Sequence, residues 1–257
     1  MASFDDNLRA CGEVEIPGMN NQRHEIIEAV WERHEDDAWR EDQSHWRGKG
    51  RWADDARWQA IGKATVAKLR AVWRLLDKPH FPEPFVALEW GPGGGTNLFA
   101  MRRLSRRYFG VDISPSNLAE CARMIGAEGY GSLFEPIHLT EAPESIVEKV
   151  AEPIDVFIST AVFQHFPSKE YGGEVLRAVK RVCKPGAVGI VQIRYDNGEE
   201  KFRPIADLSE YKEKHITANS YQIDEFWKLL RDCGLNPLMI RDINGQVNYA
   251  TFFFKAP

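Results

Sequence analysis

The chain has 257 residues, enough for one α/β domain with an appendage, and its net charge of −5 and pI of about 5.9 do not favour a nucleic acid as the main partner. No stretch approaches the roughly 18 apolar residues of a membrane span, and the acidic N-terminal region is not typical of a signal peptide. The cysteines have no metal-ligand spacing and no CxxC pair, which favours a reduced, cytoplasmic protein without a metal site: Cys11, Cys121, Cys183 and Cys233.

The first part of the chain is predicted to be helical. Residues 1–20 lack periodicity and are expected to form an arm, whereas apolar residues recur at helical spacing from residue 21 onwards. A second run at that spacing extends from Trp58 to Leu76 and predicts a helix that ends before a proline-rich break. Between the two, residues 42–52 contain glycines without periodicity and are expected to form a loop.

Tryptophan is concentrated in this region. Six of the eight tryptophans precede the proline-rich break: Trp31, Trp39, Trp46, Trp52, Trp58 and Trp73. Those on the predicted helix faces are interpreted as core. Trp46 and Trp52 stand in the loop beside His45 and several basic residues, so plain packing and pocket lining are both open for them. Flat aromatic surfaces next to hydrogen-bond donors suit a polyhydroxylated or planar ligand.

A glycine-rich stretch follows the break and reads Phe-Val-Ala-Leu-Glu-Trp-Gly-Pro-Gly-Gly-Gly-Thr-Asn over residues 85–97. Its apolar start predicts a buried strand, and Thr96 or Asn97 can cap a helix that continues to Leu104. Strand, glycine turn and helix form the first unit of a nucleotide-binding α/β domain. The dinucleotide fingerprint needs a third glycine at position 96, which is Thr here. The carboxylate of Glu89 before the turn favours a cationic ligand instead.

The rest of the chain alternates between predicted strands and helices. A second strand ends at Asp112, which lies 17 residues after Gly95, near the distance at which a carboxylate binds ribose hydroxyls. A helix-start acid is the other reading of Asp112. Pro136 places the third strand at a sheet edge. Further strands are expected at residues 154–159, 187–193, 238–242 and 247–254, and helices at residues 114–125, 144–150, 168–182 and 221–233.

The spacing E-x-G-x-G-x-G, the acid that ends the second strand, and Lys184-Pro-Gly186 before the fifth resemble the motifs of class I S-adenosylmethionine (SAM) methyltransferases. The resemblance covers about residues 85–254. It implies a Rossmann-like α/β fold, with a seven-stranded sheet whose last strand is antiparallel, flanked by helices. It also implies a helical cap over the pocket at residues 21–84 and a SAM-binding domain at 85–257. The insertion at 195–220 has no periodicity and is expected to be a functional lid.

The resemblance implies SAM as the cofactor and assigns a set of residues to it. They are Glu89, Gly91, Gly93, Gly95, Thr96, Asp112, Ile113, His138, Leu139, Thr140, Thr160 and Ala161. The sequence departs from the pattern of this family at two places. Trp90 is bulky for its position, and the insertion after the fifth strand is long.

The chemistry of methyl transfer indicates which other residues to consider. An alcohol acceptor needs a base, and His165 lies one short loop after the fourth strand, where the family carries a histidine beside the sulfonium. Packing between two phenylalanines is its other reading. Tyr195 and Asp196 are further catalytic candidates, able to orient a hydroxyl or bind a divalent cation such as Mg²⁺, although no metal spacing is present. The expected substrate contacts are His45, Trp46, Trp52, Gln164 and His215.

These observations predict a methyltransferase that acts on a small molecule, with oxygen as the acceptor. The narrower similarity is to sugar and oligosaccharide O-methyltransferases, including those that make methylated polysaccharides in actinobacteria. Three alternatives stay open: N- or C-methylation of another metabolite, methylation of RNA or protein, and SAM binding without catalysis. A homodimer is also left open, whereas no nucleic-acid or membrane partner is expected.

Overall fold

The computed structural model describes residues 19–32, 36–76 and 83–257, so the expected arm lies outside the described residues up to residue 18. The helices are α1 (Met19–Trp31), α2 (Asp37–Gln43), α3 (Asp55–Leu75), α4 (Thr96–Met101), α5 (Pro115–Ala127), α6 (Ile146–Lys149), α7 (Lys169–Val182), α8 (Tyr211–Lys214) and α9 (Ile223–Asp232). The strands are β1 (Phe85–Trp90), β2 (Ser105–Asp112), β3 (Phe134–His138), β4 (Ile154–Ser159), β5 (Cys183–Arg194), β6 (Asn236–Asn244) and β7 (Tyr249–Lys255). None of the helices in the described ranges is long and apolar enough to cross a bilayer.

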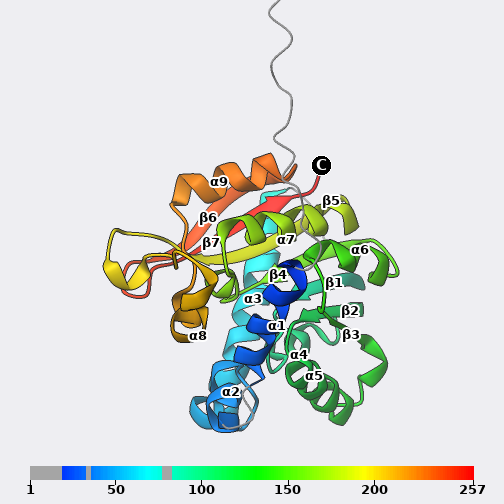
Figure 1. The fold of residues 1–257 in the computed structure, drawn as a ribbon. Coiled ribbons are helices and arrows are strands. Elements are labelled where there is room, and N and C mark those ends of the chain that lie inside the picture. The colour runs from blue at the N-terminus through cyan, green and yellow to red at the C-terminus, as the bar shows by residue number, and fades with distance from the viewer. Residues whose placement is uncertain (1–18, 33–35, 77–82) are drawn as a thin grey trace, which may run out of the picture.

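The seven strands form one sheet in the order β3-β2-β1-β4-β5-β7-β6 (Figure 1). Only β7 runs antiparallel to its neighbours, as the sequence predicted. β3 is an edge strand, which explains how it tolerates Pro136 without losing ladder hydrogen bonds. The strand order reverses between β1 and β4, and ligands of such sheets bind at the carboxyl ends of the strands beside that switch point.

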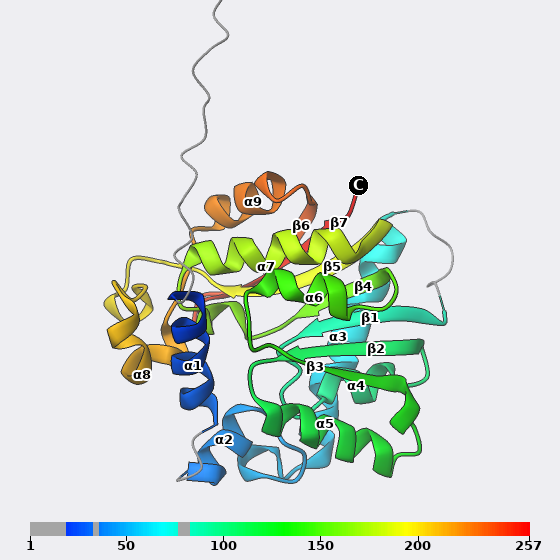
Figure 2. The same ribbon diagram turned by 45° about the vertical axis from the view of Figure 1, so that its right-hand side comes forward.

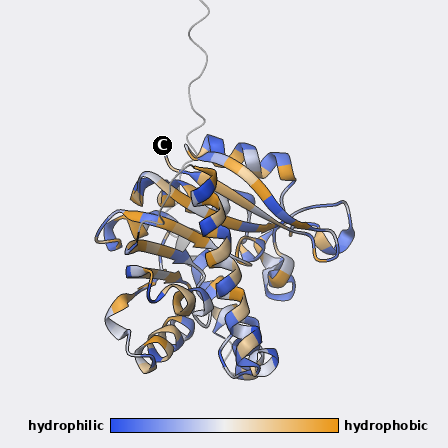
Figure 3. Ribbon diagram, turned by 180° about the vertical axis from the view of Figure 1, so that it is seen from behind, coloured by the Kyte–Doolittle hydropathy of each residue, from blue (hydrophilic) through white to orange (hydrophobic). Residues whose placement is uncertain are grey.

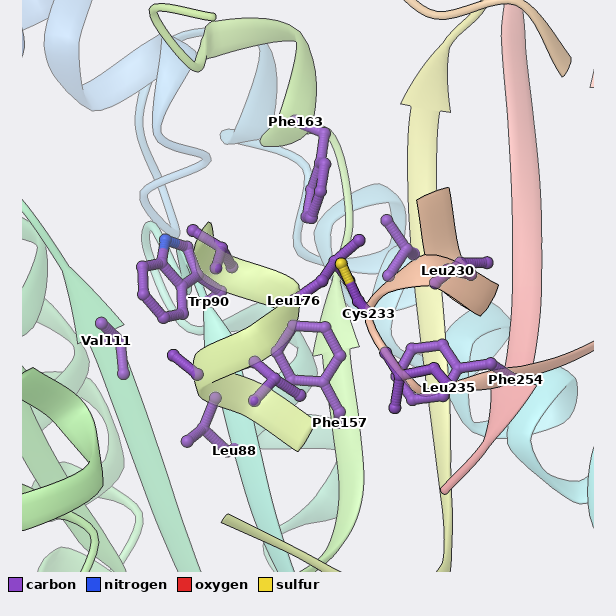
Figure 4. Close-up of a cluster of buried hydrophobic side chains, with 14 of the residues drawn as sticks. Leu88, Trp90, Val111, Phe157, Phe163, Leu176, Leu230, Cys233, Leu235 and Phe254 are labelled. Carbon is purple, nitrogen blue, oxygen red and sulfur yellow. The ribbon is translucent and has the colours of Figure 1, made fainter. Parts of the chain in front are cut away.

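Helices cover both faces of the sheet because side chains alternate along each strand. Val86, Leu88 and Trp90 of β1 pack toward α6, α7 and α9, whereas Phe85 and Ala87 pack toward α3, α4 and α5. Figure 4 shows part of the first cluster, in which Trp90 lies beside Val111 and Leu88. The bulk of Trp90 is therefore accommodated as core, with 3% of its surface exposed.

α3 packs directly on one face of the sheet. Its apolar stripe buries Trp58, Leu69, Val72 and Trp73 in the second cluster, and the helix crosses the back of the sheet (Figure 3). The segments that close over the carboxyl edge are residues 19–32 and 36–54, which include α1, α2 and the 3₁₀ turn Gly50–Trp52, and we call them the cap. α1 of the cap lies beside α8, which belongs to the insertion after β5 (Figure 2).

Several boundaries differ from the prediction. α2 and the 3₁₀ turn occupy much of the expected loop at residues 42–52 and the segment before it. α4 ends at Met101, and its N-cap is Gly95 with φ 80°. Thr96 and Asn97 do not cap α4, because the Thr96 hydroxyl donates to the Trp58 carbonyl and the Asn97 amide donates to Glu89. β5 already begins at Cys183, so the Lys-Pro-Gly stretch expected as a turn lies within the strand.

The insertion at residues 195–220 contains α8 and three 3₁₀ turns, at Glu200–Phe202, Leu208–Glu210 and His215–Thr217. Its end is fixed to the rest of the chain. The Tyr211 hydroxyl donates to the His165 carbonyl at 2.8 Å, and the Asn219 amide donates to the Gln164 carbonyl at 2.9 Å. Single helical turns carry too few residues for a periodic signal, which is why the sequence did not reveal them.

Candidate active site

A cavity of about 330 Å³ lies at the carboxyl ends of β1, β2, β4 and β5, beneath the cap. One end, which we call the cofactor end, holds the carboxylates of Glu89 and Asp112. The other, which we call the acceptor end, is lined by side chains from β5, β7, α1, α7, α8 and the segment after β4. Its polar and aromatic members are Trp31, Gln164, His165, Phe166, Tyr171, Arg194, Tyr211 and Tyr249.

Glu89 is a buried carboxyl held by two donors. It lies on the face of β1 that packs toward α3 and α4, because it alternates with Leu88 and Trp90. The Tyr108 hydroxyl and the Asn97 side-chain amide each donate to it at 2.6 Å. Burial raises its pKa to about 7, partly offset by these two hydrogen bonds. A carboxyl in this state ionises readily when a cation arrives.

Asp112 ends β2 on the same face of the sheet. Its oxygens accept from the Ser114 amide at 2.9 Å and from the Asn117 side chain at 3.5 Å. Burial raises its pKa to about 6, against the lowering effect of hydrogen bonds from Ser114, Gly93 and Asn117. The Trp46 indole donates to Asn117 at 2.9 Å and thereby orients that amide toward Asp112.

The glycine turn is contacted by protein backbone. The Gly94 amide donates to the Ser44 carbonyl at 2.6 Å. A Cβ at Gly93, whose φ is 53°, would lie 2.5 Å from the same carbonyl, and a Cβ at Gly94 would lie 2.7 Å from the Trp46 Cα. The sequence suggested that glycine admits the cofactor here. The structure shows that these two glycines admit the cap.

The cap is also fixed at the start of α5. Glu32 accepts from the Ser116 amide at 3.1 Å and from its hydroxyl at 2.6 Å, and it also accepts from the Ser114 hydroxyl. These hydrogen bonds outweigh burial and lower the pKa of Glu32. A carboxylate at the N-terminus of a helix is further stabilised by the helix dipole. The end of α1 is thus held against the start of α5 at the cofactor end.

His165 lines the acceptor end and is oriented by two contacts. Its Nδ1 lies 2.9 Å from the His215 carbonyl, and its Nε2 lies 3.2 Å from the Gln164 side-chain nitrogen. A carbonyl can only accept, so Nδ1 carries the proton and Nε2 carries the lone pair. Burial and the charges of His215 and Arg194 lower the pKa of His165 to about 4, although hydrogen bonds with the His215 and Ala161 backbone oppose them. The ring edge meets Trp31 at 5.0 Å between centroids.

Gln164 connects His165 to two further residues. Its side-chain nitrogen donates to the Tyr249 hydroxyl at 3.1 Å, and Arg194 Nη2 donates to the same hydroxyl at 3.1 Å. The opposite orientation of the Gln164 amide would place its oxygen against the Nε2 lone pair. The tautomer of His165 therefore fixes the amide as a double donor, and its Oε1 is buried without a hydrogen-bond partner.

Of the predicted cofactor residues, nine line the cavity: Glu89, Gly91, Gly93, Thr96, Asp112, Ile113, Leu139, Thr160 and Ala161. Gly95, His138 and Thr140 do not. A Cβ at Gly95 would meet Met124 and Cys121, so this glycine serves the packing of α5. His138 Nε2 contacts the Ile113 carbonyl at 3.2 Å, and Thr140 is exposed. Ala161, two residues after the end of β4, has φ 58°, an uncommon conformation for a non-glycine residue that often occurs at functional sites.

Of the predicted substrate residues, His45 and Gln164 line the cavity, whereas Trp46, Trp52 and His215 do not. Trp52 is buried in the cap, with its indole donating to the Asp42 carbonyl at 2.7 Å and its ring 4.2 Å from that of His45. His215 packs edge-on against the rings of Trp31 and Trp39.

The catalytic candidates after β5 also lie outside the cavity wall. Tyr195 packs against the core, and the Asp196 carboxylate accepts from the Gly198 amide at 2.8 Å in a tight turn. Within residues 19–32, 36–76 and 83–257, no group of three or more His, Cys, Asp or Glu side chains could hold a metal ion.

Several cavity residues were not predicted from the sequence. Asn97, Asn117 and Ser44 line the cofactor end, and Arg194 and Tyr249 line the acceptor end. For Asn97 a signal existed, since it stands eight residues after Glu89, at the second position of the helix that follows the glycine turn. Arg194 and Tyr249 meet because β5 and β7 pair in that register. No sequence pattern indicated this pairing.

The cofactor end fits SAM in charge and in hydrogen bonding. Asn97 Oδ1 and Ser44 Oγ are buried there without hydrogen-bond partners, next to a carboxyl poised to ionise. An ammonium group would find acceptors at Glu89 and Asn97. The carboxylate of Asp112 offers about four acceptor positions, of which Ser114, Gly93 and Asn117 take three, so one is left for a ribose hydroxyl.

Residues 88–191 match a family model described as a methyltransferase domain, and no curated protein matches the chain. Among solved structures, the chain is similar to magnesium protoporphyrin IX methyltransferase (ChlM) from Synechocystis PCC 6803. With bound SAH, the identity is 15%, the match covers 91% of this chain and 100% of that one, and the TM-score is 0.61. For the structure of the same protein with bound SAM, the identity is 17%, the match covers 91% of this chain and 97% of that one, and the TM-score is 0.60.

Two other solved structures show how widely this fold is used. The [4+2]-cyclase SpnF is 14% identical, with 68% of this chain and 75% of that one covered and a TM-score of 0.53. A possible exported protein from Bordetella parapertussis is 15% identical, with 73% of this chain covered and a TM-score of 0.52. The chain spans 65% of the length of that protein. At such identities these similarities show the fold alone. The segment that matches the methyltransferase-domain model contains the glycine turn and both carboxylates of the cofactor end, and the chain as a whole has the class I fold of SAM-dependent methyltransferases.

Proposed function

We propose that the chain transfers the methyl group of SAM to a hydroxyl oxygen of a small polar acceptor, with a sugar or oligosaccharide as the acceptor class. The observation that carries this proposal is the state of His165. Its Nδ1 is held by the His215 carbonyl, so the Nε2 lone pair is directed to the acceptor end. A lone pair in that place can take the proton that an alcohol must lose.

When bound, SAM supplies an electrophilic methyl group on a sulfonium. The residues of the chain then have two tasks. The first is to hold the acceptor oxygen in line with the methyl carbon, which can be worth roughly 7–11 kcal/mol. The second is to accept the hydroxyl proton at His165 Nε2 as the new oxygen–carbon bond forms and the carbon–sulfur bond breaks. An acceptor hydroxyl donates to Nε2 in place of the Gln164 amide.

The lining of the acceptor end supports a polar, ring-shaped acceptor. Trp31, Tyr171 and Tyr211 offer aromatic surfaces, and Gln164 offers a buried Oε1 without a partner. Sites with a few placed polar groups among aromatic walls fix the orientation of such ligands. The low pKa of His165 keeps the ring neutral at neutral pH, which an acceptor of a hydroxyl proton requires.

A screen with isotopically labelled SAM tests the proposal. The purified chain is incubated with SAM carrying a trideuterated methyl group and with panels of monosaccharides, oligosaccharides, other alcohols and amines. Mass spectrometry then locates the label. A labelled methyl ether supports the proposal. Label on nitrogen, on carbon or on a carboxylate oxygen contradicts it, and so does SAM binding without transfer to any hydroxyl in the panels.

A further inference from the structure

Arg194 ends β5 at the acceptor end, and its hydrogen bonds go to neutral partners. Nη1 donates to the Val247 carbonyl at 3.2 Å, and Nη2 donates to the Tyr249 hydroxyl at 3.1 Å. Its Nε is buried without a hydrogen-bond partner. Within the described ranges of the chain, no carboxylate forms a salt bridge with Arg194. The guanidinium lies over the rings of Phe202 and Tyr249, at 5.1 and 4.8 Å from their centroids, which compensate only part of its desolvation. A partly buried guanidinium without an anionic partner is unusual.

The Tyr249 hydroxyl is a second donor at the same place. Its oxygen already accepts from two N–H groups, those of Gln164 and Arg194. Both acceptor positions of the oxygen are filled, so its own hydrogen has to point toward a further acceptor. None of the hydrogen bonds between described residues has this hydrogen as its donor group. The free N–H groups of Arg194 and the O–H of Tyr249 therefore form a group of donors without an acceptor.

The charges around the cavity are divided between its two ends. Glu89 and Asp112, the two carboxylates that line it, both lie at the cofactor end. Arg51, the other cation of the wall, has a salt bridge with Asp42 at 3.1 Å. The acceptor end thus carries the unpaired positive charge of Arg194. The same charge lowers the pKa of His165, which places Arg194 within electrostatic reach of the proposed base.

We propose that the methyl acceptor carries a carboxylate group, which binds Arg194 and Tyr249 while the hydroxyl to be methylated lies at His165. This inference rests on the proposed function and narrows its substrate class to hydroxy acids, of which uronic acids are the sugar members. Three hydrogen bonds of 3.1–3.2 Å, through Gln164 and Tyr249, connect His165 to Arg194. A planar guanidinium matches the oxygens of a carboxylate and of a phosphate alike, but a phosphate monoester carries about 1.5–2 negative charges at pH 7, whereas Arg194 supplies one positive charge, which a carboxylate balances.

Binding of a minimal carboxylate tests the site without knowledge of the acceptor. The full chain, saturated with SAH and labelled with ¹⁵N, is titrated with sodium acetate, with acetamide as the neutral isostere and with methyl phosphate as the other anion. NMR follows the Arg194 Nε–H and Gln164 side-chain resonances, assigned through Arg194→Lys and Gln164→Leu. We expect acetate to shift both resonances saturably, and acetamide to shift neither.

Substitutions identify the residues that bind the anion. Arg194→Gln should weaken acetate binding by at least about tenfold, measured on the Gln164 resonance, because a charge-assisted hydrogen bond is lost. Tyr249→Phe keeps the ring that stacks on Arg194 and removes only the donor, so it should weaken binding several-fold. Arg70→Gln, an exposed arginine on α3, is the matched control and should leave binding unchanged.

The proposal is overturned if acetate gives no saturable shift, if acetamide acts equally, or if acetate binding survives in Arg194→Gln. Binding of methyl phosphate without acetate also overturns it, in favour of a phosphorylated acceptor. Because acetate binding requires no methyl transfer, the outcome is separate from that of the labelling screen. A methyl ester product in that screen would refute hydroxyl methylation and leave the anion site standing.

Discussion

The backbone amide of Gly94 donates a hydrogen bond to the carbonyl of Ser44, which joins the glycine turn to the cap across 50 residues of sequence. Ser44 also contributes an unpaired hydroxyl to the cofactor end of the cavity. The cofactor end is therefore built from two segments at once, and the glycine turn is shaped as much by the cap as by its ligand.

The first prediction concerns this contact. Gly94→Ala should lower SAM affinity and the free energy of unfolding, each by about 1–3 kcal/mol, because the new methyl group meets backbone atoms that cannot rotate away. Calorimetry with SAM and thermal unfolding measure the two effects. Gly126→Ala in α5 is the control, since a Cβ there meets nothing within 4 Å. Equal behaviour of the two variants would show that the cap contact is dispensable.

The second prediction concerns protons. The pKa of Glu89 is about 7 in the folded chain against an ordinary 4.5, so the folded chain binds an additional proton between these pH values. Its contribution to stability is present below pH 4.5 and is lost as the pH rises through 7. Cationic SAM should favour the ionised form and release this proton at pH 6.5. Calorimetry in phosphate and in imidazole should then give different binding enthalpies, and Glu89→Gln should remove the difference. Identical enthalpies for the native chain would refute the linkage.

The third prediction concerns Asp112. Asp112→Ala should weaken SAM binding by about 1.5–3 kcal/mol, the range for hydrogen bonds to a charged group. Thermal unfolding has to be measured alongside, because the Ser114 amide and the Asn117 side chain lose their acceptor. Asp232→Ala, which removes an exposed carboxylate of α9, provides the comparison. Unchanged SAM affinity in Asp112→Ala would mean that Asp112 does not bind SAM and only stabilises the start of α5.

The fourth prediction concerns His165. If a histidine with the ordinary pKa were the general base, the rate of methyl transfer would rise around pH 6.5. Since the pKa of His165 lies at about 4, methyl transfer should instead be independent of this group from pH 6 to 8 and should fall only as the pH approaches 4. His165→Ala and His165→Gln should each lower kcat by roughly 10²–10⁴-fold while SAM affinity changes little. A folded variant with a native rate would remove His165 from the reaction.

The fifth prediction concerns the insertion. The exposed residues 197–201 should exchange amide hydrogens faster than the sheet and slow down with acceptor bound, whereas the Asn219 amide, bonded to the Gln164 carbonyl, should be protected in both states. Hydrogen exchange followed by mass spectrometry resolves the two parts. Protection of residues 197–201 that is strong and equal in both states would make the whole insertion a fixed scaffold.

The sequence predicted what depends on local order. The apolar run that begins β1, the glycine motif after it and the spacing from Gly95 to Asp112 predicted the strands, the turn and both carboxylates. The contacts of Trp46, Trp52 and His215 could not be predicted in this way, because residue type shows that a ring is flat but not which way it faces. The role of Arg194 could not be predicted from the sequence for a related reason. Its partners on β7 are set by strand register over more than 50 residues, and its lack of an anion is visible only once all neighbours are placed.

The place of α3 in the second core cluster limits how the chain can be recombined. A boundary at residue 84 would separate Trp58 and Leu69 from the strands they cover, and it would also break the close approach of Gly62 to the Thr96 carbonyl. A chimaera that takes its cap from another protein of this fold should therefore exchange residues 19–54 and retain α3. Crossovers at Asp54, the N-cap of α3, would keep the apolar contacts between α3 and the sheet.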